Sequence, residues 1–110
     1  MLPRSRRLST RALRGARWQH ETRTPFFIVR WTSPKKTPGR YAVSVPLRVS
    51  KNAPVRNNVR RAVFAALRAY APQCGSDAFF IISSRALNRA PQELETAIKG
   101  FIERTTTPTP

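Results

Sequence analysis

The sequence predicts a small α+β sandwich, with helices packed on one mixed β-sheet in the order helix, two or three strands, helix, strand, helix. Apolar residues recur at steps of three and four residues over 53–70 and 91–102, as they do in amphipathic helices. Short runs rich in aromatic and β-branched residues at 25–31, 40–45 and 78–82 are typical of strands. The chain has 110 residues, 40% of them hydrophobic, so it can bury one core and we expect a single domain.

The first segment is expected to contain one short helix. Residues 1–19 contain six Arg and no acid, and Leu8, Ala12 and Leu13 have helical spacing. An Arg-rich segment without acids is also typical of an organelle transit peptide. We disfavour that alternative, because removal of such a leader would deprive the domain of its first element.

The strands at 25–31 and 40–45 should pair as a hairpin, because turn-forming residues separate them. Pro46 cannot donate a hydrogen bond to a neighbouring strand, so the second strand should end there or lie at a sheet edge. A short third extended segment can follow at 47–50. The apolar run 78–82 has no polar alternation, so we expect a central strand covered on both faces.

The helix over 53–70 has the strongest pattern in the chain. Asn52 is a favourable N-cap residue, and Pro54 is tolerated in the first helical turn. A second amphipathic helix should begin near Pro91, and residues 105–110 should form a disordered tail beyond a single domain at 1–104. The apolar side of this last helix comprises Leu94, Ala97, Ile98, Phe101 and Ile102.

Charge is the strongest functional signal in the sequence. The 21 Lys and Arg against 5 Asp and Glu give a net charge of +16, and residues 1–70 hold 17 of the basic residues with one acid, Glu21. Such a balance indicates a polyanionic partner. Arg outnumbers Lys 17 to 4, and the planar guanidinium suits phosphate contact and base stacking, which favours nucleic acid over an anionic membrane. No apolar stretch reaches the roughly 20 residues needed to cross a bilayer, so we expect a cytoplasmic protein without membrane contact.

No catalytic residue, metal ligand or protein-bound cofactor is expected. Cys74 is the single cysteine and His20 the single histidine, which excludes an intrachain disulfide and a zinc site of Cys and His ligands. The sequence has no paired carboxylates for acid–base chemistry, no Ser/His/Asp set and no acidic cluster to hold Mg²⁺. The protein should therefore bind its partner without itself cutting it.

The helix over 53–70 should carry the binding surface. On a helical wheel Val55, Val59 and Val63 share the packed side, and the opposite side presents cations. The helix contains no Asp or Glu, whereas a solvated helix usually mixes both signs, so we interpret its cationic side as a phosphate-binding face. Phe64 falls within this face, which leaves two explanations open: a shifted register or loop contact, or stacking on an unpaired base. The face comprises Asn57, Arg60, Arg61 and Arg68, with Arg56 at its border.

The strand 40–45, the pair 48–49 and the helix start 55–61 together resemble the signature of the protein subunit of bacterial ribonuclease P. That signature reads Arg-x-Gly-Phe-Ser-Val, then Lys-Lys-Val-Gly-x-Ala, then Val-Arg-Asn-Arg-x-Lys-Arg at a helix start. The chain departs from this signature at Asn58, where the family has Arg. It also departs at Pro46 and Leu47, where the family has Ser-Lys. The matching residues are Arg40, Ser44, Val45, Val49, Val55, Arg56, Asn57 and Arg61, with Arg48 and Arg60 in place of Lys.

The resemblance implies a ribosomal-protein-S5-domain-2-like fold and a division of labour with RNA. In that family a large ribonuclease P RNA uses Mg²⁺ to cleave precursor tRNA, and the protein is its auxiliary subunit. The implied partners are therefore this RNA and precursor tRNA, with no obligate protein partner. The residues implied to bind the catalytic RNA are Arg56, Asn57, Arg60 and Arg61, flanked by Arg48, Lys51 and Arg68. A cleft on the sheet is implied to hold the single-stranded 5′ leader, and its expected aromatic lining is Phe26, Phe27, Trp31 and Tyr41.

Two alternatives have similar composition. A small ribosomal protein is also basic, rich in Arg and docked on structured RNA. A DNA-binding module is less consistent with the sequence, because no helix-turn-helix spacing precedes the basic helix. Co-purification distinguishes them, since a ribosome-sized particle indicates the first alternative and a single RNA of several hundred nucleotides indicates ribonuclease P.

Overall fold

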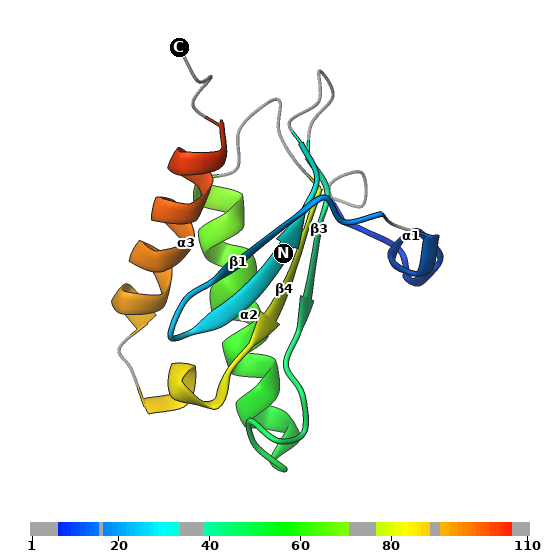
Figure 1. Cartoon of the computed structure of the whole chain (residues 1–110). Coiled ribbons are helices and arrows are strands. Elements are labelled where there is room, and N and C mark those ends of the chain that lie inside the picture. Colours follow the sequence, from blue (N-terminus) through cyan, green and yellow to red (C-terminus); the bar gives the residue numbers. More distant parts are fainter. Residues whose placement is uncertain (1–6, 16, 34–38, 71–76, 89–90, 107–110) are drawn as a thin grey trace.

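The computed structural model describes residues 7–15, 17–33, 39–70, 77–88 and 91–106. Figure 1 shows α2 and α3 side by side on one face of a sheet, with α1 on the other side of that sheet. The elements in chain order are α1 (Thr10–Gly15), β1 (His20–Arg23), β2 (Phe27–Trp31), β3 (Tyr41–Ser44), α2 (Ala53–Tyr70), β4 (Ala78–Ile82), the 3₁₀ helix η2 (Ser84–Asn88) and α3 (Pro91–Thr106).

The four strands form one mixed sheet in the order β1-β2-β4-β3. β2 is antiparallel to both β1 and β4, whereas β3 runs parallel to β4 and is connected to it through α2. The α+β class, the mixed sheet and the central position of the 78–82 strand are thus confirmed. The predicted hairpin between the 25–31 and 40–45 strands is wrong, because β4 lies between β2 and β3 and supplies hydrogen bonds to both.

β1 was not expected from the sequence, and the short third strand that was expected at 47–50 is wrong. β1 pairs with β2 across a tight turn in which the Thr24 hydroxyl accepts hydrogen bonds from the backbone N–H groups of Phe26 and Phe27 at 3.2 and 3.1 Å. Residues 47–49 form a turn instead of a strand, closed by the Val49 N–H donating to the Pro46 carbonyl at 3.0 Å. The chain therefore reverses direction immediately before α2.

The core lies between the sheet and the two long helices. Alternate residues of the strands point to this side and are fully buried, among them Val29 and Phe80. Phe80 packs edge-on against Phe27 and Phe101, with ring centroids 5.2 and 5.6 Å apart. The predicted apolar side of α3 is confirmed, since Leu94, Ile98, Phe101 and Ile102 are buried and Ala97 packs against them.

The other face of the sheet, here called the open face, is not covered by α2 or α3. Phe79 and Ile81 of β4 point to this face and are only half-buried, so the expectation that β4 is covered on both faces is wrong. Both helices pack on the same side of the sheet, so neither covers the second face. The short segments near α1 lie on that second face. The residues on the open face are Glu21, Arg23, Ile28, Arg30, Ala42, Ser44, Phe79 and Ile81.

A buried carboxylate joins the ends of three strands. Asp77, which is 6% exposed, accepts hydrogen bonds from the Arg40 backbone N–H at 2.9 Å and from the Arg40 guanidinium at 3.0 Å. The Asp77 N–H donates to the Thr32 hydroxyl at 3.0 Å, which ties the end of β2 to the starts of β3 and β4. Arg40, one of the residues that carries the family resemblance, therefore stabilises the fold.

Several expectations fall on residues that are not described. Cys74 and residues 107–110 lie outside the described residues, whereas Thr105 and Thr106 belong to α3, two residues beyond the expected end of the domain. Among the described residues no helix is long and apolar enough to cross a membrane.

Candidate RNA-binding surface

The exposed side of α2 carries cations and no acid over its whole length. The helix begins at the predicted N-cap, where the Asn52 side chain accepts a long hydrogen bond from the Val55 N–H at 3.5 Å. Val63 and Leu67 are fully buried, which orients the helix on the core. The exposed side presents Asn57, Asn58, Arg61 and Arg68 to solvent.

Arg56 and Arg60 lie at the border of this side and are half-buried. The Arg60 guanidinium donates to the Asn57 side-chain oxygen at 2.9 Å, so two predicted RNA-binding residues hold each other in place. The Arg56 guanidinium donates to the Ser50 carbonyl at 2.8 Å and thereby fixes the turn before α2. This turn carries Arg48 and Lys51, both exposed, so the structure brings all seven predicted RNA-binding residues onto one helix and its preceding turn.

Phe64 packs against the core and is half-buried. Of the two explanations that the sequence left open, the shifted register is the one that the structure supports. The buried side of α2 includes Leu67, which is fully buried, and this moves the centre of the packed side towards Phe64. Phe64 therefore contributes to the packing of α2 on the core.

The expected aromatic lining of the leader cleft is wrong for Phe27 and Tyr41. Their side chains are 0% and 3% exposed, because both point to the side of the sheet that α2 and α3 cover. Trp31 points to the same side, where its ring packs edge-on against Phe101 and its indole N–H donates to the Thr22 hydroxyl at 3.1 Å. Phe26 is half-buried and packs against the same core.

Two other aromatic residues lie on the opposite side of the sheet. Trp18, which follows α1, is half-buried and lies near Phe79 of β4 with ring centroids 6.4 Å apart. Trp18 borders two hollows of about 360 and 470 Å³. The first is also lined by Leu8, Ala12, Gly15, Arg17, Thr32, Arg40 and Asp77, and the second by Gln19, His20, Glu21 and Arg30. The sequence analysis did not predict this pair. Side chains alternate along a strand, so Phe79, next to the buried Phe80, could have been expected on the opposite face of the sheet.

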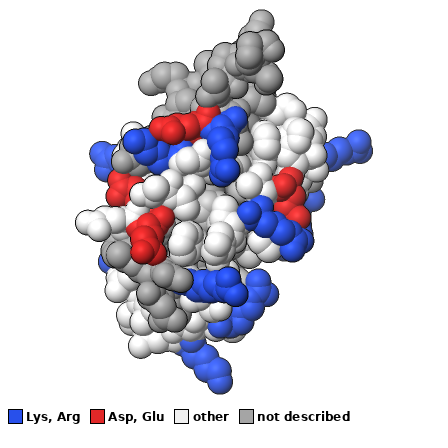
Figure 2. All heavy atoms as spheres, turned by 60° about the vertical axis from the view of Figure 1, so that its left-hand side comes forward, with Lys and Arg blue, Asp and Glu red and all other residues white. Residues whose placement is uncertain are grey.

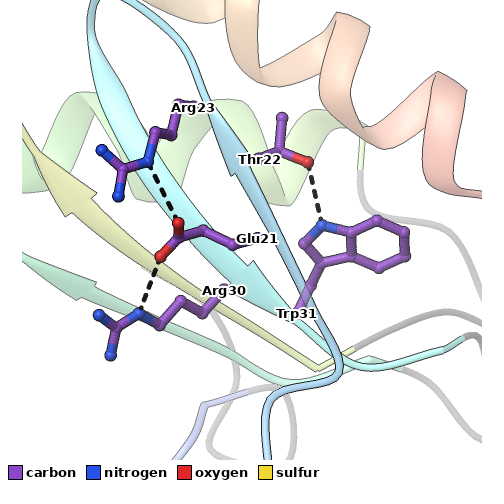
Figure 3. A network of polar contacts seen from close by, with 5 residues as sticks. All are labelled: Glu21, Thr22, Arg23, Arg30 and Trp31. Atoms are coloured by element: carbon purple, nitrogen blue, oxygen red, sulfur yellow. Dashed lines mark hydrogen bonds and ion pairs between the residues drawn. The ribbon is translucent and has the colours of Figure 1, made fainter.

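Glu21 holds two Arg side chains on the open face (Figure 3). Its two carboxylate oxygens accept hydrogen bonds from Nε of Arg23 at 3.1 Å and Nε of Arg30 at 3.3 Å. The pKa of the Glu21 carboxyl is lowered, first by the hydrogen bond from Arg23 and further by the charge of Arg23 and by Arg30, against an opposing effect of desolvation. Glu21 is therefore a carboxylate at neutral pH.

Acidic residues are concentrated in α3, and α2 contains none. Three of the five acids of the chain, Glu93, Glu95 and Glu103, are in α3. Figure 2, which brings the α3 side of the molecule forward, shows acidic and basic side chains interspersed among neutral ones. Among the described residues no group of three His, Cys, Asp or Glu is placed to hold a metal ion.

The fold and the charge distribution define a class of small basic α+β proteins, with a four-stranded mixed sheet covered by two helices on one face. The family model described as Ribonuclease P matches residues 2–106. The chain therefore belongs to the ribonuclease P protein family and is a protein component of ribonuclease P, which makes a ribonuclease P RNA its partner. No curated protein matches the sequence significantly.

Solved bacterial structures share the fold at low sequence identity. A Staphylococcus aureus RNase P protein mutant with defective mRNA degradation activity matches with a TM-score of 0.75 at 17% identity, over 91% of this chain and 87% of that chain. The RNase P protein from Thermotoga maritima matches with a TM-score of 0.72 at 16% identity, over 92% and 98% of the two chains. Another structure of the S. aureus protein gives 0.70 at 18%, over 96% and 92%. These similarities confirm the fold of the chain.

Proposed function

We propose that the protein binds ribonuclease P RNA through α2 and the turn before it, and assists the 5′ maturation of tRNA in the bacterial cytoplasm. The observation that supports this proposal is the acid-free helix, which holds Arg61 and Arg68 in solvent while its other side packs on the core. Arg48 and Lys51 extend the same cationic surface. A phosphate backbone relieves the repulsion among these charges and releases counterions when it binds.

The open face of the sheet is the proposed site for the single-stranded 5′ leader of precursor tRNA. Trp18 and Phe79 offer half-exposed rings there, and bases gain about 1–3 kcal/mol each by stacking on such rings. Arg23 and Arg30 add positive charge to the same face. These residues take the place of the four aromatic residues expected from the sequence, which lie on the helical side.

The catalyst in this proposal is the RNA, which uses Mg²⁺, and the protein alone should not cleave RNA. Protein purified free of all RNA is expected to leave precursor tRNA intact in the presence of Mg²⁺, because nothing in its sequence is arranged to activate a nucleophile. Gel analysis of end-labelled precursor measures this. Cleavage that persists in a His20→Ala variant would contradict the assignment and require a different site.

The proposed activity is tested by adding the purified protein to a bacterial ribonuclease P RNA at low Mg²⁺. We expect the rate of precursor tRNA cleavage to rise, because the protein supplies positive charge that the metal otherwise provides. An unrelated basic protein of similar size and charge serves as the control. If both proteins raise the rate equally, or neither does, the proposed function is wrong.

A further inference from the structure

Glu21 is unusual because it is the one acid among residues 1–70, and it lies on the proposed leader-binding face. Its carboxylate lies between Arg23, on the same strand, and Arg30, its cross-strand partner on β2. The side chains of Glu21, Arg23 and Arg30 are 37, 72 and 49% exposed, so the cluster faces solvent.

The geometry leaves the outer edges of both guanidinium groups available. Each Arg uses Nε to contact Glu21, and a guanidinium has five N–H donors in a planar fork. Within the part of the chain that the structure describes, the side chains of Arg23 and Arg30 make no other hydrogen bond. Figure 3 shows both guanidinium ends projecting to the same side, beyond the carboxylate that holds their stems.

We propose that Glu21, Arg23 and Arg30 form a clamp for a backbone phosphate of single-stranded RNA, with Glu21 as the positioning residue and the two Arg as the groups that contact the phosphate. The proposal rests on the proposed function of the open face, and it adds a specific ligand group and the residues that take it. The terminal nitrogens of Arg are suited to a phosphate, because each fork donates two parallel N–H groups. The hollow bordered by Trp18 adjoins Glu21 and Arg30, so a base can stack beside the bound phosphate.

Glu21 affects the affinity for RNA in two opposite ways, by repelling the phosphate and by positioning the two Arg side chains. Repulsion between the carboxylate and a phosphate across screened water changes affinity by less than about twofold. Holding a long side chain in its binding conformation before the ligand arrives is equivalent to about two- to tenfold in affinity per side chain. Because Glu21 holds two such side chains, its positioning effect outweighs its repulsion. Removing this acid should therefore weaken the binding of RNA.

The test compares precursor tRNA that carries a leader with mature tRNA, using the holoenzyme reconstituted from full-length protein and ribonuclease P RNA. We expect Glu21→Gln and Glu21→Ala to weaken precursor binding by about threefold or more, with the larger loss in Glu21→Ala, and to leave mature tRNA binding unchanged. Glu103→Gln, an acid of α3 on the other side of the sheet, is the charge-matched control and should change neither affinity. Unchanged or tighter precursor binding in both Glu21 variants overturns the clamp, as does an equal loss for both tRNAs.

A neutral phosphate in the leader identifies the contact directly. Methylphosphonate linkages are placed one at a time along the leader, and one or two of them should weaken binding to the unmodified holoenzyme. The same linkages should have a smaller effect with Arg30→Ala protein, because one of the two Arg contacts to that phosphate is already lost. Equal sensitivity at those linkages in all proteins excludes the clamp. If the unmodified holoenzyme binds precursor and mature tRNA equally, the leader site itself is wrong, which is a separate result from failure of the clamp alone.

Discussion

Replacing Arg61 and Arg68 together with Ala should lower the affinity for ribonuclease P RNA by about 10- to 100-fold at physiological salt. Both side chains are exposed on α2 and lie away from the buried side of the helix, so the change should leave the fold intact. The expected size follows from a charge-assisted contact to phosphate of about 1.5 kcal/mol each, reduced by solvent exposure. A log–log plot of affinity against salt should be shallower by about 0.7 for each contact removed.

The matched control for this pair is Arg104→Ala, which removes an exposed cation from α3. It should leave the salt slope unchanged, because α3 lies on the part of the surface where the acids are concentrated. Circular dichroism and the Tm should show that all variants are folded. An unchanged slope in the double variant, or an equal change in Arg104→Ala, would place the RNA on another surface.

Phe80→Ala should lower the free energy of unfolding by about 3–5 kcal/mol, a large part of the stability of a domain this size. Phe80 is fully buried at the centre of the sheet, and its ring contacts Phe27 of β2 and Phe101 of α3. Truncation removes both aromatic contacts and leaves a cavity that the surrounding strands cannot close. Urea unfolding followed by circular dichroism measures the loss.

Phe79→Ala is the matched control, because it truncates the same side chain one residue earlier on the same strand. Phe79 points to the open face and is half-buried, so we expect a loss of roughly 1 kcal/mol or less in stability. It should instead weaken the binding of leader-bearing precursor tRNA by removing a stacking surface. If both variants lose the same stability, the assignment of the two sheet faces is wrong.

The helices could be predicted from the sequence because their periodicity is complete within each segment. α2 has the predicted bounds and α3 the predicted start, and the buried side of α3 is the expected one. Strand pairing could not be predicted in the same way, because a strand pattern carries no information about which other strand supplies its hydrogen bonds. β1 was missed since its sequence, His-Glu-Thr-Arg, lacks the apolar alternation of a strand with a buried face.

The predicted basic residues lie together, whereas the predicted aromatic residues do not lie on the open face. The cations of α2 could be placed because one side of that helix is apolar and the other is not. For β2 and β3, alternation separates two sets of side chains but does not indicate which set faces the helices. Phe27 and Tyr41 fell on the helical side, and the short segment containing Trp18 has no periodicity that predicts its place beside Phe79.

The position of β4 in the sheet has a consequence for the synthesis of the protein. Apart from an isolated bridge to Arg7, β3 pairs only with β4 among the described strands. β2 also pairs with β4, on the edge opposite β1. Strands that pair across a long stretch of chain must close a large loop before they gain contacts, which slows folding. On the ribosome, β3 and then α2 emerge before β4, the strand with which β3 pairs. We therefore expect α2, the proposed RNA-binding helix, to reach its final position only after β4 and α3, in the last third of the chain, have been translated.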